Sequence, residues 1–171
     1  MLAALVAGAA VVAVSNAGAA TPPTPAGWSR AVTQICAGAV LFEGTHQIGT
    51  RAGAIAVSRD IRSTGGRRVG RVDALAKPPL GAELVARWIA VERRLVATYA
   101  SSYLRIWYAI ERANTPAQRA RLPRMLAPLL HAPDALQAEA QRFEQLLQVP
   151  DCTGGIQPPP PSGDLGAAPG T

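Results

Sequence analysis

The sequence contains few of the residues that build metal and catalytic sites. Only two cysteines and two histidines, His46 and His131, occur among its 171 residues. A zinc site needs three or four ligands, and neither histidine stands at a ligand spacing from a cysteine. The patterns G-x-S-x-G, H-E-x-x-H and the phosphate-binding P-loop do not occur in the sequence either. We therefore predict a protein without metal, cofactor or enzymatic activity; a hydrolase would need one of the histidines to meet a carboxylate in a cleft.

Aromatic residues are also scarce, at 5% of the chain, and Lys77 is the single lysine among 17 basic residues. Alternating β-branched runs are few, whereas alanine, leucine, arginine and glutamine are common. This composition favours helix over sheet. The preference for arginine over lysine is typical of GC-rich coding sequence, and the net charge of +6 by itself indicates little about function.

The first twenty residues predict a signal peptide. Residues 2–14 are an unbroken run of apolar and small residues, and residues 17–20 are the small residues Ala-Gly-Ala-Ala that signal peptidase accepts. No lysine or arginine precedes the run, so the usual positive charge is reduced to the α-amine. The alternative is an uncleaved membrane anchor, because residues 2–20 are uncharged. Both interpretations place the protein outside the cytoplasm, either secreted or at the cell envelope.

Residues 21–153 then form one domain of common size, and residues 154–171, rich in proline and glycine, are expected to be a disordered tail. The first helix is expected to begin near Pro25, with Thr24 as its N-cap. Its apolar residues at spacings of three and four are Trp28, Val32, Ile35, Ala39 and Phe42. A break is expected at residues 44–47.

The middle of the chain predicts a second helix, a linker and a long helix. The second helix covers about 49–62 and ends at Gly65 and Gly66. Residues 67–79 are interpreted as a surface linker held by Val69, Val72 and Leu75. From 80 to 113, one apolar stripe recurs over roughly eight turns, and its members are Leu84, Trp88, Val91, Leu95, Tyr99, Ser102, Ile106 and Ile110.

The last part of the domain begins with the best local signal in the chain. Thr115, Pro116 and Gln118 have the pattern of a capping box. We expect Pro123 and Pro128 to interrupt the helix that follows, and a last helix to restart at 133–134. Its apolar face consists of Leu136, Ala140, Phe143 and Leu147. The predicted fold is an all-α bundle of four or five helices with one long central helix, stapled by a disulfide.

The disulfide would join Cys36, on the first helix, to Cys152, after the last one. An exported protein makes a disulfide the default state of two cysteines. The alternative is two separate buried thiols. A bond between them would close a long loop, for which chain-entropy reasoning predicts a stabilisation of about 4 to 5 kcal/mol.

The arrangement resembles a loosely defined group of small exported helical proteins of GC-rich bacteria. The matching residues are Trp28, Ile35-Cys36-Ala37, Pro78-Pro79 and Pro150-Asp151-Cys152. The resemblance covers about residues 27–153. It implies export and a disulfide, and it implies no activity, since members of the group are generally uncharacterised.

Two surface features are candidate binding sites. Six arginines, Arg51, Arg59, Arg62, Arg67, Arg68 and Arg71, lie within twenty-one residues around Gly65-Gly66. Four of them (Arg62, Arg67, Arg68 and Arg71) are candidates for an anion site on a flexible loop, for lipid headgroups or envelope polymers. The alternative is a solvated basic face. Nucleic acid is excluded as a partner because no aromatic platform accompanies the arginines.

The second candidate is the aromatic series Tyr99, Tyr103 and Trp107, with Tyr108 beside it. Spacings of four place the three rings on one side of a helix, where they would either line a ligand pocket or belong to the core. Glu92 and Glu111, each next to arginines, are interpreted as members of surface ion pairs.

The sequence thus predicts a non-enzymatic interaction or structural module of the envelope, whose partner is an envelope protein or an anionic polymer or lipid surface. The alternative function is a small-molecule or lipid-binding bundle with its pocket against the long helix.

Overall fold

The computed structural model describes residues 23–37 and 50–152. The predicted signal peptide (1–20), the predicted break (44–47) with His46, and the predicted tail (154–171) lie outside the described residues. So do Ala39 and Phe42 of the first apolar stripe. None of the described helices combines the length and the hydropathy that a membrane crossing requires.

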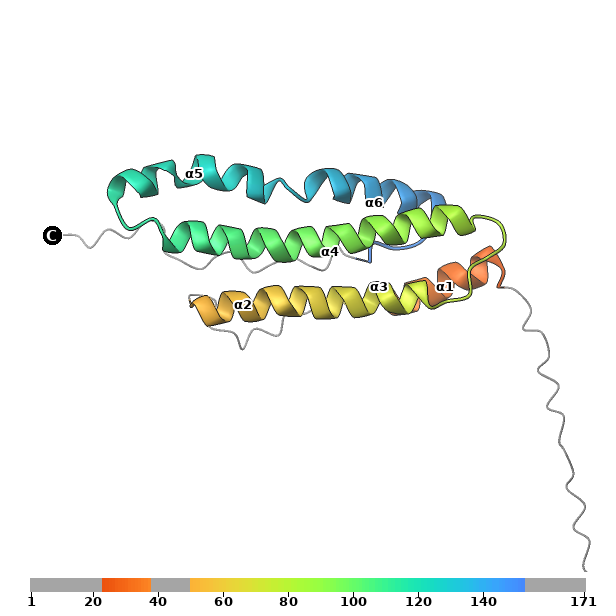
Figure 1. Cartoon of the computed structure of the whole chain (residues 1–171). Coiled ribbons are helices and arrows are strands. Elements are labelled where there is room, and N and C mark those ends of the chain that lie inside the picture. Colours follow the sequence, from red (N-terminus) through yellow and green to blue (C-terminus); the bar gives the residue numbers. More distant parts are fainter. Residues whose placement is uncertain (1–22, 38–49, 153–171) are drawn as a thin grey trace, which may run out of the picture.

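The described residues form an all-α protein without strands. Its helices are α1 (Pro25–Cys36), α2 (Arg51–Asp60), the π-helical turn η1 (Ile61–Gly65), α3 (Gly66–Asp73), α4 (Ala82–Glu111), α5 (Pro116–Leu130) and α6 (Asp134–Leu147). They make four rods, because α2, η1 and α3 are continuous and α5 and α6 form one bent rod. In Figure 1, α4 lies between the α2–α3 rod and the α5–α6 rod. The predicted bundle with one long central helix is confirmed.

The start of α1 is as predicted. The hydroxyl of Thr24 accepts a hydrogen bond from the Gly27 amide, and Pro25 takes the first helical position. Trp28 and Val32 are buried, and Ile35 packs against the core. The ring of Trp28 meets that of Trp88 edge-on, with centroids 6.1 Å apart.

The predicted end of the second helix at Gly65-Gly66 is wrong. Both glycines have right-handed helical angles, and the chain runs through η1 into α3. A π turn contains one more residue than an α turn, so the side chains that follow it are rotated back around the helix axis. Val69 and Val72 therefore stay on the buried side that Ile61 occupies. Residues 66–73 are consequently helix where a linker was expected, although Val69, Val72 and Leu75 do pack against the core as predicted.

The predicted interruption at Pro123 and Pro128 is also wrong, since α5 runs through both prolines. The capping box at its start is confirmed: Thr115 and Gln118 each bond the backbone amide of the other. Each proline removes an N–H and frees the carbonyl four residues earlier. Both prolines are exposed, as are Arg119 and Arg124, the residues with the freed carbonyls, so water can satisfy those groups. The break falls instead at residues 131–133.

The core lies along α4 and is closed by the C-terminal segment. Val85, Leu95 and Ala100 of α4 are fully buried, and Ala140 and Phe143 of α6 pack beside them. After α6 the chain turns at Gln148, whose φ is 53°, and returns to the bundle through residues 149–152.

The predicted disulfide is confirmed: Cys36 and Cys152 are bonded, with their Cα atoms 4.8 Å apart and 116 positions apart in sequence. It joins α1 to the segment that follows α6, and both cysteines are buried. Such bonds form and persist in oxidising compartments.

Candidate functional site

The four arginines of the predicted anion site lie on the continuous helix of η1 and α3, and not on a flexible loop as predicted. Arg62, Arg67 and Arg71 are exposed. Arg68 is half-buried and donates from Nη1 to the carbonyl oxygen of Cys152, at 2.9 Å. Burial lowers the pKa of Arg68, and the charges of Asp151 and Glu92 act in the opposite direction. Arg68 is therefore engaged with the C-terminal segment and is separated in role from the three exposed arginines.

The predicted pocket residues Tyr99, Tyr103 and Trp107 belong to the core. Tyr103 is buried, and Tyr99 and Trp107 pack against the core cluster. The Tyr99 hydroxyl donates to Oε1 of Gln137 on α6, at 3.1 Å. Burial raises the pKa of both tyrosines. The interpretation of this series as core, which the sequence favoured over a pocket, describes what the structure contains at Tyr99 and Tyr103.

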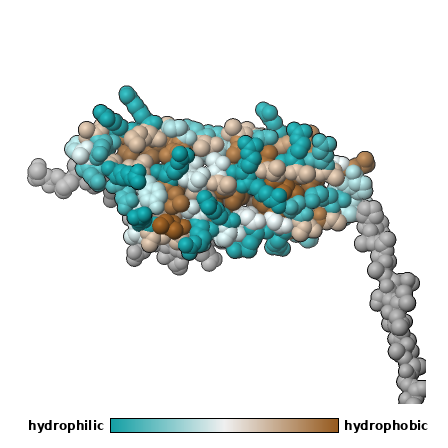
Figure 2. Space-filling view, in the orientation of Figure 1, coloured by the Kyte–Doolittle hydropathy of each residue, from teal (hydrophilic) through white to brown (hydrophobic). Residues whose placement is uncertain are grey.

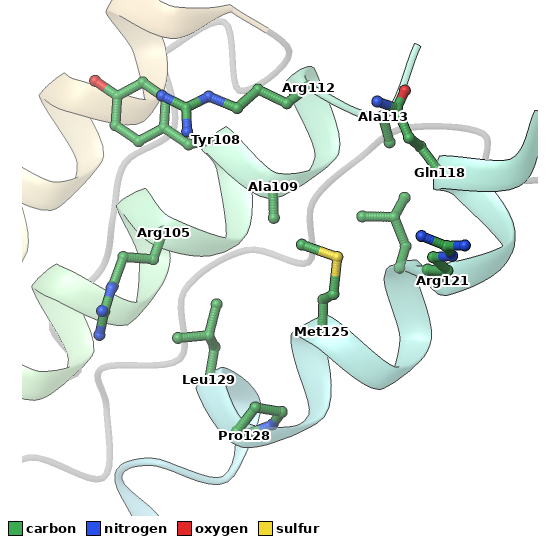
Figure 3. A pocket seen from close by; sticks show the side chains of 11 residues that line it. Arg105, Tyr108, Ala109, Arg112, Ala113, Gln118, Arg121, Met125, Pro128 and Leu129 are labelled. Carbon is green, nitrogen blue, oxygen red and sulfur yellow. The ribbon is translucent and has the colours of Figure 1, made fainter. Parts of the chain in front are cut away.

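A groove does lie against the long helix, and it is lined by Arg105 and Tyr108 on either side of Trp107 in the sequence. It measures about 560 Å³ and runs between the C-terminal half of α4 and the helix α5. Its lining residues are Arg105, Tyr108, Ala109, Arg112, Ala113, Gln118, Arg121, Leu122, Met125, Pro128 and Leu129. In Figure 3, Met125 and Leu129 of α5 extend toward Ala109 of α4, and the arginines lie around this apolar floor. Figure 2 shows hydrophobic patches between hydrophilic side chains on the face that Figure 1 presents.

The rim of the groove is positively charged. Arg105, Arg112 and Arg121 line it, and none of the three has a carboxylate partner among the described residues. The guanidinium of Arg112 lies 5.9 Å from the ring centre of Tyr108, and that of Arg51 lies 5.6 Å from it. Such cation–π contacts orient guanidinium groups without neutralising them. The groove therefore combines an apolar floor with positive charge that no carboxylate of residues 23–37 or 50–152 pairs with.

A second cluster is buried between α4 and α6, and sequence reasoning missed it. Glu92 is 1% exposed and Glu144 is 6% exposed, so the interpretation of Glu92 as part of a surface ion pair is wrong. Glu111, the other glutamate considered, is exposed. Glu92 Oε1 accepts a hydrogen bond from Trp88 Nε1 at 3.1 Å, and Glu92 lies near enough to Glu144 to affect the pKa of its carboxyl group.

Burial raises the pKa of Glu144 to about 7, and the negative charge of Asp151 adds to this effect. The neighbouring polar groups of Glu92, the Cys152 backbone and Trp88 lower the pKa of Glu144 and so act in the opposite direction. Two carboxyl groups in contact resist losing both protons, because the second ionisation places like charges side by side. The pair therefore holds one proton under mildly acidic conditions.

Helical periodicity contains the signal that would have found this pair. Glu92 follows Trp88 by four residues and precedes Leu95 by three, so it falls on the apolar stripe of α4. Glu144 stands four residues after Ala140 and three before Leu147, on the apolar face of α6. A glutamate on a buried stripe needs a partner. Only the packing of α4 on α6 brings the two glutamates near each other.

The described histidine lies apart from both clusters. His131 Nδ1 is 2.8 Å from Asp134 Oδ2, and both side chains are mostly exposed at the junction of α5 and α6.

No family model, curated protein or solved structure matches the chain.

Proposed function

We propose that the protein is an exported, non-enzymatic binding module of the cell envelope, and that its α4–α5 groove binds an anionic amphiphile. The observation that carries the proposal is the combination of three arginines with an apolar floor in one groove of about 560 Å³. Export is supported by the disulfide, which is typical of oxidising compartments, and by the apolar run at residues 2–14.

The chemistry of the groove defines the ligand class. Leu122, Met125 and Leu129 supply apolar surface, and the flexible thioether of methionine adapts to chains of different shape. Arginine binds carboxylate and phosphate oxygens through two parallel N–H donors. A single acyl chain with a carboxylate or a phosphate head satisfies both parts of the groove. Fatty acids and lysophospholipids share this chemistry.

The proposal is tested by calorimetric titration of the protein with palmitate, lysophosphatidylglycerol and a neutral monoacylglycerol, each below its critical micelle concentration. We expect the two anions to bind and the neutral lipid to bind more weakly. The stronger of the two anions identifies the head group, carboxylate or phosphate. Binding of the anions is expected to weaken with added salt, because exposed charges are screened.

The variant Arg112→Gln/Arg121→Gln removes two charges from the rim and should weaken anion binding about tenfold or more, since a hydrogen bond to a charged group is worth about 1.5 to 3 kcal/mol. The matched control is Arg124→Gln, an exposed arginine of α5 that does not line the groove. Equal binding of the neutral lipid, or unchanged binding by the double variant, would contradict the proposal. In that case the second candidate, a structural module without a groove ligand, gains support from the filled core at Tyr103.

A further inference from the structure

The two most exposed large apolar side chains of the described residues lie at one end of the bundle. Leu80 is 83% exposed and Leu146 is 68% exposed. Leu80 stands in the turn between α3 and α4, and Leu146 stands in the last turn of α6. In Figure 1, this turn, the end of α6 and the start of α1 lie together at one end of the molecule. The two leucines therefore belong to one surface.

Both leucines line a groove of about 520 Å³ at this end. A single exposed leucine is ordinary, whereas exposed apolar side chains gathered around one groove are typical of contact surfaces. The floor of the groove is part of the core, because Trp28 lines it and is buried. We call its apolar lining the apolar tip, which consists of Pro25, Ala26, Leu80, Leu84, Leu146 and Leu147.

The backbone of the turn holds Leu80 in its exposed position. Pro78 is buried, and Gly81 has a φ of 94°, in the left-handed region that glycine adopts without a steric penalty. The Gly81 carbonyl oxygen accepts from the Val85 amide at 2.9 Å, which begins α4. Leu80 is thus fixed between a buried proline and a helix start, and its side chain points away from the core.

Charges of both signs stand beside the apolar tip. Lys77 is paired with Asp73 at 3.0 Å. Glu83 and Arg87 both line the hollow next to the tip, which also contains Leu84. The tip therefore offers apolar contact, and its surroundings do not select a partner of one charge.

The sequence that precedes α1 indicates what covers the tip. The apolar run predicted to enter a membrane ends at residue 14, and α1 begins at Pro25, a residue of the tip. The residues between them span at most about 40 Å when fully extended. Helix α4, with 30 residues, is itself about 45 Å long. While the run is in a membrane, as a signal or as an anchor, the tip is therefore the end of the bundle nearest the lipid.

We propose that the apolar tip inserts Leu80 and Leu146 into the surface of the membrane that holds the residues before α1, so that the bundle stands end-on on the lipid. A tethered domain meets the surface at high effective concentration, so two leucine side chains suffice for a contact that would be weak in a free protein. The α4–α5 groove lies toward the other end of α4. The two proposals share the export of the chain and are otherwise independent.

Hydrogen–deuterium exchange of the full, oxidised chain, with and without phosphatidylcholine vesicles, tests the contact. We expect the amides of residues 80–84 and 146–149 to gain roughly tenfold protection with vesicles, because burial of one leucine side chain is worth at least that factor. Added salt should leave this protection unchanged, since an apolar contact is not screened.

The variant Leu80→Ser/Leu146→Ser should lose the added protection at the tip while the chain still floats with the vesicles through residues 2–14. The matched control is Leu130→Ser, the same change at a leucine of α5 that is 54% exposed; its tip should be protected as in the wild type. Protection that vesicles do not increase, that the double variant keeps, or that salt removes would overturn the proposal. So would protection that rises with protein concentration in the absence of lipid, because it would identify a second copy of the chain as the partner.

Nuclear magnetic resonance of the wild-type chain in phosphatidylcholine bicelles gives a test that needs no variant. With a nitroxide on the acyl chain of a lipid, the methyl signals of Leu80 and Leu146 should broaden, and those of Leu130 should not. Equal broadening of all three leucines, or of none, would exclude insertion of the tip.

Discussion

Glu144 has a native environment that differs strongly from the one it has in the unfolded chain. Its carboxyl group is buried beside Glu92 and Asp151, and its pKa is raised to about 7 from an ordinary value of 4.5. Between about pH 4.5 and about pH 7, this carboxyl group is protonated in the native state and ionised in the unfolded state. The contribution to stability is complete below about pH 4.5 and is lost as the pH rises to about 7.

We expect the free energy of unfolding to fall by about 2 to 3 kcal/mol between pH 5 and pH 8 from this group alone. Glu144→Gln should remove most of the decline and should be more stable than the wild type at pH 8. Urea unfolding at several pH values measures the free energy of unfolding of the wild type and of Glu144→Gln. A glutamine variant that declines as steeply as the wild type would show that another group is responsible.

Asp73 contributes a pH dependence of stability in the opposite direction. Hydrogen bonds from Lys77 and Arg93, at 3.0 and 2.6 Å, hold the pKa of its carboxyl group below the ordinary value. The contribution of Asp73 to stability is complete above the ordinary pKa of 3.8 and is lost as the pH falls below that value. For these two groups taken together, the contribution to stability is greatest in mildly acidic solution.

At the scale of elements, α4 organises the bundle because both neighbouring rods pack on it. Helices α2, α3, α5 and α6 all contact α4, as Figure 1 also shows. Its buried residues occupy several successive turns, so the stripe makes continuous contact along most of the helix. The largest losses of stability are therefore expected from truncations on this stripe.

Leu95→Ala should lower the free energy of unfolding by about 2 to 5 kcal/mol, the usual range for a leucine removed from a packed core. Leu95 is 0% exposed. Leu80→Ala is the control with the same chemical change, since Leu80 is 83% exposed and precedes α4; it should change stability by less than about 0.5 kcal/mol. Similar losses for the two variants would mean that Leu95 does not lie in the core.

Helix α5 is the element in which a substitution should stabilise the protein. Pro123 lies inside the helix and is exposed, so Pro123→Ala restores one backbone hydrogen bond without disturbing the core. A proline in a helix interior costs about 3 kcal/mol relative to alanine. Greater flexibility of the unfolded chain offsets about 1 kcal/mol of the gain.

Thermal unfolding should show a higher midpoint for Pro123→Ala. Pro116→Ala is the control, because Pro116 occupies the first turn of α5, where no intrahelical N–H bond is required. A lower midpoint for Pro123→Ala would show that the ring has a native role that its exposure does not indicate.

At the scale of the whole molecule, the disulfide connects α1 to the end of the bundle across 116 positions of sequence. Replacement of both cysteines by serine should lower the free energy of unfolding by about 2 to 5 kcal/mol. Denaturant unfolding measures the loss, and mass spectrometry without reductant should detect Cys36 and Cys152 in one linked peptide. Free thiols in the oxidised native protein would contradict the bond.

The sequence by itself determined the helical class, the long α4, the caps at Thr24 and Thr115, and the pairing of two cysteines. These features depend on residues within a few positions of one another, or on a single available pairing. The periodicity of apolar residues defines the face that each helix buries, and the cap side chains bond backbone groups three positions away.

The tertiary structure alone decided how the helices meet. Gly65-Gly66 continues as helix because its π turn keeps Val69 on the core side, and Pro123 is accepted because its side of α5 faces water. The groove depends on how α5 lies against α4. Glu92 and Glu144 meet only because α4 and α6 pack at one register. The rotation and offset of one helix against another follow from side-chain packing across the whole core, which no local pattern encodes.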